Sequence, residues 1–178
     1  TEDGVRFDPD DAQGGLGFVN TYTENTYKTA TLNKTDHFAF LKGYPGGGFA
    51  PGKNMSRAEV TTMFARLLTE QMEANKSYPA SFSDVTSAHW AANYIGYMEQ
   101  FGIVRGYSNG TFQEKNTITY GAALKLIMPA AGYGEQAPTV KGSPFSGYLA
   151  KAKAAGLVSG NPKLNGPITR LQIAQIAA

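Results

Sequence analysis

The chain has 178 residues, with 16 Lys and Arg residues against 14 Asp and Glu residues, and its formal net charge is +2. This near balance argues against a nucleic-acid-binding protein, because such a protein usually gathers basic residues on one face. The absence of cysteine excludes disulfides, thiolate catalysis and thiolate metal sites, and no apolar run approaches the length that a membrane span requires.

The first 31 residues differ in composition from the rest, because Thr, Asn, Asp and Gly dominate them. They contain one strand-like stretch, at residues 17–23. We interpret residues 1–31 as a linker or the edge of a preceding domain. The chain starts at Thr1 and stops at Ala178 inside an apolar-periodic run, so we expect it to be a fragment of a larger, processed protein.

A Gly-rich segment occurs twice, 63 positions apart, as Gly43-Tyr-Pro-Gly-Gly-Gly-Phe49 and Gly106-Tyr-Ser-Asn-Gly-Thr-Phe112. Seven residues after each Phe, a tetrad opens an apolar run: Ser56-Arg-Ala-Glu59 in the first copy and Thr119-Tyr-Gly-Ala122 in the second. A pattern that returns at a fixed spacing indicates an internal repeat.

A third copy is shorter. Residues 101–106 match residues 155–160, and Thr169-Arg-Leu-Gln172 opens the last apolar run after a turn with four fewer residues. We place the copies at residues 32–80, 81–136 and 137–178.

Apolar periodicity predicts a leading helix over residues 91–101, with Gly102 in a left-handed conformation at its end. The equivalent helix spans residues 145–155 and ends at Gly156. Asp84 or Ser87 is expected to cap the helix that carries Trp90. Each full copy therefore predicts a helix, a Gly-rich turn and a capped second helix. The first copy lacks the leading helix, and its residues 36–42 are expected to be extended.

The tetrads have a structural interpretation. Ser56 with Glu59, and Thr169 with Gln172, fit the capping box at a helix N-terminus. Thr119 keeps the cap, but Ala122 loses the return bond.

Arg57 and Arg170 are harder to explain by capping. Both fall at the first helical position, where the helix dipole disfavours a cation by roughly 0.3–1 kcal/mol. One interpretation is a solvated or locally ion-paired arginine. The other is that the arginine and exposed helix N–H groups converge on an anion, to which the guanidinium offers bidentate geometry.

The ordered set of motifs resembles the S-layer homology (SLH) domain. It comprises Phe82-Ser-Asp-Val85, His89-Trp-Ala91, Gly102-Ile-Val104, Gly106–Phe112 and the tetrads, and the resemblance covers about residues 32–178. It implies a mainly α fold in which three repeats pack as a pseudo-threefold bundle. It also implies non-covalent anchoring of a surface protein to secondary cell-wall polysaccharide, which often bears pyruvate ketals.

The resemblance also implies a set of ligand-binding residues in the grooves between repeats. Arg57 and Arg170 would bind the ligand's carboxylate, and Glu59 and Gln172 would organise the helix starts. Trp90 would either stack on a sugar or lie in the core. Glycine would let the backbone approach the sugar closely. The remaining implied groove residues are Asp84, Gly43, Tyr44, Gly106 and Tyr107.

Three departures limit this comparison. Tyr120 stands where the second copy should have Arg, Gly46-Gly47-Gly48 replaces the family's Asp-Gly-Thr, and the third copy has no equivalent of Trp90. At most two grooves should therefore carry the arginine. Residues 17–23 also resemble the closing strand of Cna-B-like surface domains.

We expect an extracellular wall anchor at the surface of a bacterium, without catalysis, cofactor or metal. Its expected partners are secondary cell-wall polysaccharide and neighbouring domains of the same surface protein, but not nucleic acid or a membrane interior. The alternative is a structural or interaction module that has lost glycan binding. A wall hydrolase would need paired carboxylates, and no spacing singles out a pair.

Overall fold

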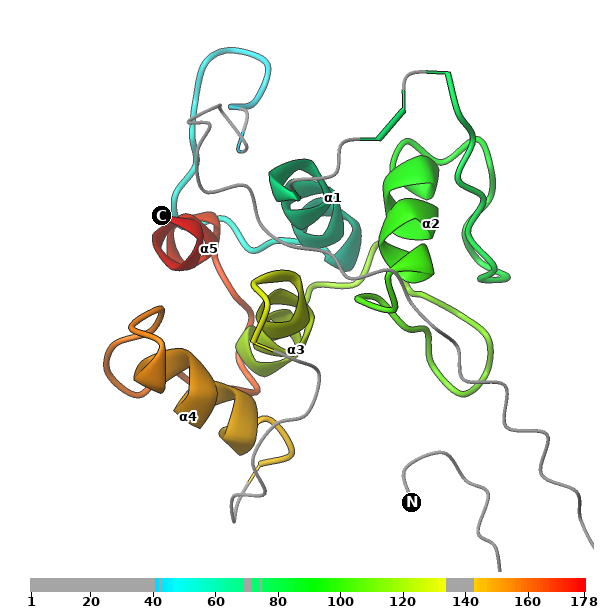
Figure 1. Ribbon diagram of the computed structural model, residues 1–178. Coiled ribbons are helices and arrows are strands. Elements are labelled where there is room, and N and C mark those ends of the chain that lie inside the picture. Colours follow the sequence, from blue (N-terminus) through cyan, green and yellow to red (C-terminus); the bar gives the residue numbers. More distant parts are fainter. Residues whose placement is uncertain (1–40, 42, 69–71, 74, 134–142) are drawn as a thin grey trace, which may run out of the picture.

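The computed structural model describes residues 41, 43–68, 72–73, 75–133 and 143–178. It contains α1 (Arg57–Leu67), α2 (Ala92–Gln100), α3 (Tyr120–Ala130), α4 (Ser146–Ala154) and α5 (Arg170–Ala177) (Figure 1). Within these ranges the only β pairings are isolated bridges. The mainly α fold class is confirmed. Residues 1–31, with the strand-like stretch, and residues 36–40 lie outside the described part.

The two leading helices that the sequence predicts correspond to α2 and α4, and the three capped helices to α1, α3 and α5. α1 packs on α2 and on α3, while α3 also packs on α4. Gly102 and Gly156 end the leading helices with φ angles of 65° and 75°, as a left-handed C-terminal residue should. None of the described helices is long and apolar enough to cross a membrane.

A ring of backbone hydrogen bonds ties the three copies together at their centre. The amide of Met55 donates to the carbonyl of Ile168 at 3.1 Å, that of Ile118 to Met55 at 3.0 Å, and that of Ile168 to Ile118 at 3.1 Å. Each of these residues precedes one of the capped helices, and each is at most 2% exposed. Three equivalent residues that bond in a closed cycle define a pseudo-threefold axis.

Each capped helix begins against the turn of the next copy around this axis. The amides of Arg57 and Ala58 donate to the carbonyls of Asn116 and Glu114 at 2.9 and 3.0 Å. The same pair of bonds recurs at the starts of α3 and α5, whose partners are Gly166 and Leu164, and Lys53 and Pro51. The N-terminal amides of a helix lack partners within the helix, so the neighbouring copy satisfies them here.

The capping devices form as the tetrads predict. Glu59 Nα donates to Ser56 Oγ at 3.2 Å, and Ser56 Nα donates to Glu59 Oε2 at 2.8 Å. Thr169 and Gln172 form the same box at the start of α5. Thr119 caps α3 through the amide of Ala122, without a return bond.

The predicted cap of α2 is wrong. Its N-cap residue is Ala91, which makes no side-chain bond to the helix. Asp84 is not available for this task because its carboxylate accepts hydrogen bonds from the second Gly-rich turn. The chain therefore reaches α2 without a side-chain cap.

Candidate functional site

Arg57 reaches out of the first copy and lies on the Gly-rich turn of the second. Its Nε donates to the carbonyl of Phe112 at 2.9 Å, and its Nη2 donates to the carbonyl of Arg105 at 3.1 Å. The guanidinium carbon is 4.4 Å from the centre of the Phe112 ring and 5.2 Å from that of Tyr107. Burial lowers the pKa of Arg57, although Tyr107 and Asp84 oppose that shift. The arginine stays charged and clamps two copies together.

Arg170 repeats this arrangement between the third copy and the first. Its Nε donates to the carbonyl of Phe49 at 2.8 Å, and its guanidinium carbon lies 4.7 Å from the Tyr44 ring centre. Only 5% of Arg170 is exposed. Cation–π contacts contribute roughly 0.5–2 kcal/mol each, which is enough to offset the unfavourable dipole at the first helical position. The recurrence of Arg in the tetrads therefore has a structural cause.

One of the two sequence interpretations of these arginines must be corrected. We expected exposed helix N–H groups to converge on an anion beside the arginine. In α1 the amides of Arg57 and Ala58 donate to the second copy, and the amide of Glu59 donates to Ser56 Oγ. These helix-start amides are occupied, so any anion must be bound by side chains or by other backbone groups.

The third junction carries no arginine clamp. Tyr120 stands at the equivalent position and is 6% exposed, and burial raises its pKa. The next residue is Gly121, where a Cβ atom would lie 2.4 Å from the ring of Phe145. Tight packing of the third copy's leading helix thus replaces the arginine clamp at this junction.

Asp84 holds the second turn in shape. Its Oδ1 accepts from the amide of Phe112 and its Oδ2 from the amide of Gln113, each at 2.7 Å. Desolvation opposes ionisation of this carboxyl, but the amide hydrogen bonds and the charge of Arg57 outweigh it, so the pKa of Asp84 is lowered. Gln113 has a φ of 59°, so the chain turns through the left-handed region directly after these two amides.

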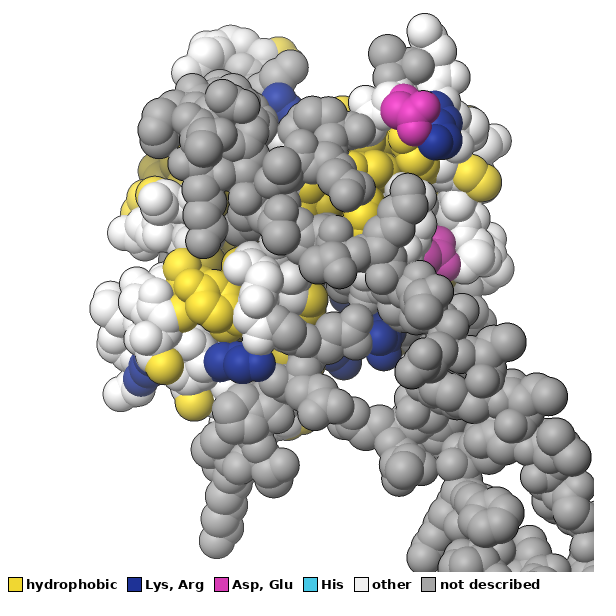
Figure 2. All heavy atoms as spheres, in the orientation of Figure 1, with side chains coloured by type: hydrophobic (Ala, Val, Ile, Leu, Met, Phe, Trp, Pro, Cys, Tyr) yellow, Lys and Arg dark blue, Asp and Glu magenta, His cyan; other side chains and the backbone are white. Residues whose placement is uncertain are grey.

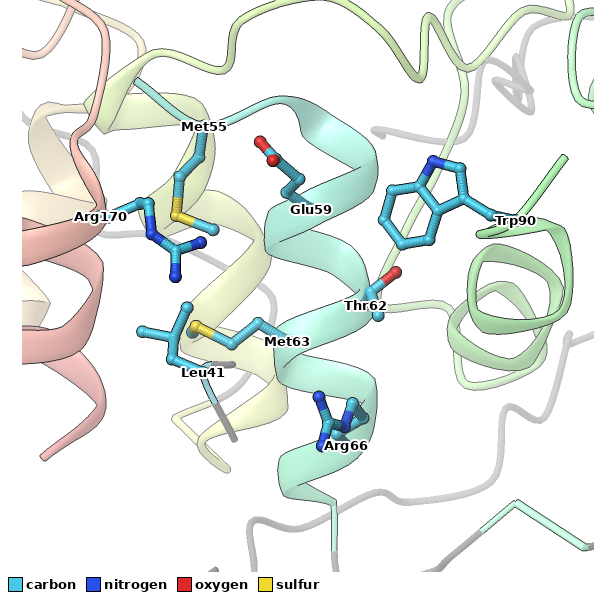
Figure 3. Close-up of a pocket in the computed structure, with 8 residues that line it drawn as sticks. All are labelled: Leu41, Met55, Glu59, Thr62, Met63, Arg66, Trp90 and Arg170. Carbon is cyan, nitrogen blue, oxygen red and sulfur yellow. The ribbon is translucent and has the colours of Figure 1, made fainter. Parts of the chain in front are cut away.

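Trp90 lies at the surface, with 59% of its area exposed. Of the two sequence interpretations, exposure favours a stacking surface and argues against a core tryptophan. Its indole borders a pocket of about 110 Å³ that lies over α1, between the start of α2 and the start of α5 (Figure 3). The described residues that line it are Leu41, Met55, Glu59, Thr62, Met63, Arg66, Trp90 and Arg170.

This pocket, which we call the α1 pocket, joins residues of all three copies. Arg170 comes from the third copy, Glu59 and Arg66 from the first, and Trp90 from the second. Sequence reasoning missed Arg66. Its spacing from Glu59 contained the signal, because residues 59, 63 and 66 fall on one face of a helix.

The other implied residues gather at the two Gly-rich turns. Tyr44 lies under Arg170, and Tyr107 lies under Arg57 and is 46% exposed. Gly43 begins the first turn, where a Cβ atom would lie 3.3 Å from the carbonyl oxygen of Gly48. Gln172 remains at the start of α5 as the capping partner of Thr169.

Gly106 has a packing role within the second turn. A Cβ atom at this position would lie 2.6 Å from the ring of Phe82 and 2.7 Å from the carbonyl oxygen of Thr111. The absent side chain therefore makes room for the ring of Phe82 and the carbonyl of Thr111. The expected approach of this backbone to a sugar stays a prediction.

The described residues form no large cationic patch on the face drawn in Figure 2. The described Lys and Arg side chains of this face lie at separate places, with apolar side chains between them. Lys76 forms an ion pair with Glu73 at 2.5 Å. The described part of this face therefore agrees with the balanced composition.

Comparison with known families identifies the repeats. The S-layer homology domain model matches residues 39–61 and 81–124, which include Arg57, Glu59, Asp84 and Trp90. The matched segments belong to the first and second copies. The resemblance of residues 17–23 to Cna-B-like domains finds no support in the comparisons.

Three relatives illustrate the similarity. The chain is 35% identical over 138 residues to a cellulosome-anchoring protein of Acetivibrio thermocellus, covering 71% of this chain and 31% of that protein. It is 34% identical to a cell surface protein of Thermoanaerobacter kivui, covering 72% of this chain and 16% of the relative. It is 27% identical to a surface layer protein of Brevibacillus choshinensis, covering 75% and 12%. The chain spans less than a third of the length of each.

Proposed function

Because this chain is an S-layer homology domain protein, homologous to surface-layer and cellulosome-anchoring proteins, we propose that it holds a bacterial surface protein on the cell wall. Two of the relatives named above are a surface layer protein and a cell surface protein, and this chain belongs at the cell surface with them. The attachment is non-covalent, and its partner is the secondary cell-wall polysaccharide. Neighbouring domains of the same surface protein are further partners.

The α1 pocket carries the proposal. It places the side chains of Arg66 and Arg170 and the exposed indole of Trp90 around one opening. Guanidinium groups suit a carboxylate because their N–H donors match its two oxygens. An exposed indole offers an apolar face with a polar edge, which suits a sugar ring. An acidic sugar, such as one with a pyruvate ketal, uses both features.

The proposed activity is binding without cleavage. Glycoside hydrolysis requires two carboxyl groups on either side of the scissile bond. Glu59 is the one carboxylate among the described residues that line the α1 pocket, and its Oε2 already accepts a bond from Ser56 Nα at 2.8 Å. The capping box therefore occupies the group that catalysis would need.

A second candidate is a structural module without glycan binding. The observation in its favour is that Arg57 and Arg170 both clamp the turns of neighbouring copies. The fold would need both arginines for its stability even if the protein bound no sugar. Arginine variants alone therefore do not separate the two candidates.

Trp90 separates them because it is exposed and its loss leaves the core intact. We expect Trp90→Ala to lower affinity for purified cell-wall sacculi about five-fold, since an aromatic contact is worth about 1 kcal/mol. Tyr133→Ala is the matched control, because Tyr133 is 37% exposed and does not line the α1 pocket. Equal sacculus binding by the wild type and both variants would contradict the proposed pocket.

A further inference from the structure

The first Gly-rich turn presents two backbone amides that bond to no residue that the structure describes. They belong to Phe49 and Ala50, at the end of the segment Gly43–Phe49 and just after it. Ala50 is exposed, and Phe49 is 38% exposed. Ala50 has a φ of 50°, a left-handed backbone conformation that residues other than glycine rarely adopt.

The second turn shows what such a pair of amides binds. Phe112 and Gln113 are the equivalent residues, 63 positions later, and Gln113 has a φ of 59°. Their amides each donate at 2.7 Å to one oxygen of the Asp84 carboxylate. The hydrogen bonds inside the turns also match, because Tyr44 donates to Gly48 at 3.0 Å and Tyr107 to Thr111 at 2.8 Å.

The arginine contacts reinforce this equivalence. Arg57 Nε donates to the carbonyl of Phe112, and Arg170 Nε donates to the carbonyl of Phe49, at 2.9 and 2.8 Å. Each turn therefore has a guanidinium on its carbonyl side. At the second turn the amides also bind the carboxylate of Asp84. At the first turn the guanidinium and the two amides are present, but no described carboxylate accepts from those amides.

The first turn also carries a second cation on its tyrosine ring. Lys53 lies with its Nζ 4.1 Å from the centre of the Tyr44 ring, and the equivalent residue of the second copy is Asn116. Lys53 and Arg170 thus contact the same tyrosine ring. These two cations at the first turn favour the binding of an anion there.

The third copy provides the contrast. Its shortened turn places Pro162 and Lys163 at the positions of Phe112 and Gln113, as counted back from the axis residues Ile168 and Ile118. Proline has no amide hydrogen to donate. Only the first and second turns therefore have two adjacent backbone amides that can donate to one carboxylate.

We propose that the amides of Phe49 and Ala50 bind the carboxylate of an acidic wall sugar, in the place that Asp84 occupies at the second turn. The identity of the sugar rests on the proposed function; the preference for a carboxylate rests on the second turn. A uronate and a pyruvate ketal both present this group. Arg170 and Lys53 supply the positive field, and the two amides fix the orientation of the oxygens.

Amide chemical shifts of the ¹⁵N-labelled chain test the proposal directly. Sodium glucuronate is the probe, and sodium chloride at equal ionic strength with glucose is the control. We expect saturable downfield shifts of the Phe49 and Ala50 amides with glucuronate only. The amides of Phe112 and Gln113 serve as the internal control and should stay in place, because Asp84 already occupies them.

Two results would overturn the proposal. One is the absence of a saturable response at Phe49 and Ala50. The other is a pair of amides that already resonate as far downfield as Phe112 and Gln113 before any glucuronate is added, since another group would then fill the site.

A gain-of-site variant provides a second readout. Asp84→Ala removes the carboxylate from the second turn, so the amides of Phe112 and Gln113 should begin to respond to glucuronate. Acetate should raise the melting temperature of the variant more than that of the wild type. If Asp84→Ala folds and its freed amides ignore both carboxylates, the pair does not recognise external carboxylates and the proposal fails. If the variant does not fold, the wild-type titration decides.

Sacculus binding by the wild-type chain separates this site from the anchoring function. Wall binding without an amide response would overturn the carboxylate site and leave anchoring in place. An amide response without wall binding would support the site and contradict anchoring.

Discussion

Arg57 of the first copy and Phe112 of the second are joined by a hydrogen bond of 2.9 Å from Nε to the carbonyl oxygen, across 55 positions of sequence. The same guanidinium lies over the phenylalanine ring, at 4.4 Å from its centre. Arg170 and Phe49 repeat the relationship at the junction of the third copy with the first. Two of three junctions are therefore held by an arginine that contacts both the backbone and the ring of one residue.

The first prediction concerns this clamp. Arg57→Ala should lower the free energy of unfolding by about 2–3 kcal/mol, because charge-assisted hydrogen bonds and ring contacts are lost together. Arg57→Lys should recover little of this loss, since a lysine has no planar fork to bond two carbonyls. Urea denaturation measures both. Lys115→Ala is the control, because its side chain is 85% exposed and its 3.9 Å ion pair with Glu114 should contribute at most about 1 kcal/mol. A lysine variant as stable as the wild type would contradict the clamp.

The second prediction concerns acid stability. The folded-state pKa of Asp84 is lower than the usual value for an aspartate, so the unfolded chain binds its proton first as the pH falls. Stability from Asp84 is therefore fully present above about pH 4 and is lost as the pH falls through the lower folded-state pKa. Asp84→Asn should remove this part of the pH dependence. Thermal melts between pH 2 and pH 6, about the range that linkage predicts, compare the two proteins, and identical slopes would refute the role of Asp84.

The third prediction concerns Gly106. A methyl group at this position would meet the ring of Phe82 and the carbonyl of Thr111, at 2.6 and 2.7 Å. Gly106→Ala should therefore cost about 1–3 kcal/mol of folding free energy, as overpacking usually does. The matched control is Gly52→Ala, because a Cβ atom there meets nothing within 4 Å and its φ is not positive. If both variants have the same melting temperature as the wild type, the packing explanation is wrong.

The fourth prediction concerns the helix caps. Thr169→Ala should destabilise the chain by about 1 kcal/mol, because the capping box at the start of α5 loses its side-chain acceptor. Thr169→Ser keeps the oxygen and should be nearly neutral. Guanidinium denaturation of both variants checks this, and equal losses would mean that packing of the methyl group, rather than the cap, matters.

The repeated tetrads made the helix starts predictable. A capping box acts within four residues, so Ser56 with Glu59 and Thr169 with Gln172 contain all the information that their geometry needs. The same holds for Gly102 and Gly156, because a helix end needs a left-handed residue at one position.

The partners of the arginines could not be predicted in this way. Spacing along the chain does not reveal which copy follows another around the axis, so the contact of Arg57 with Phe112 was out of reach. Asp84 was assigned to the wrong partner for a related reason. It precedes α2 closely in sequence, but its carboxylate lies against amides 28 and 29 positions away.

Wall anchoring itself is tested most directly by sedimentation of the wild-type chain with purified sacculi from the source bacterium, before and after mild acid treatment that removes ketal-linked pyruvate. We expect the chain to sediment with untreated sacculi and to stay in solution after the treatment, because the treatment removes the carboxylates that the arginines and amides bind. A folded chain that stays in solution with untreated sacculi would contradict anchoring.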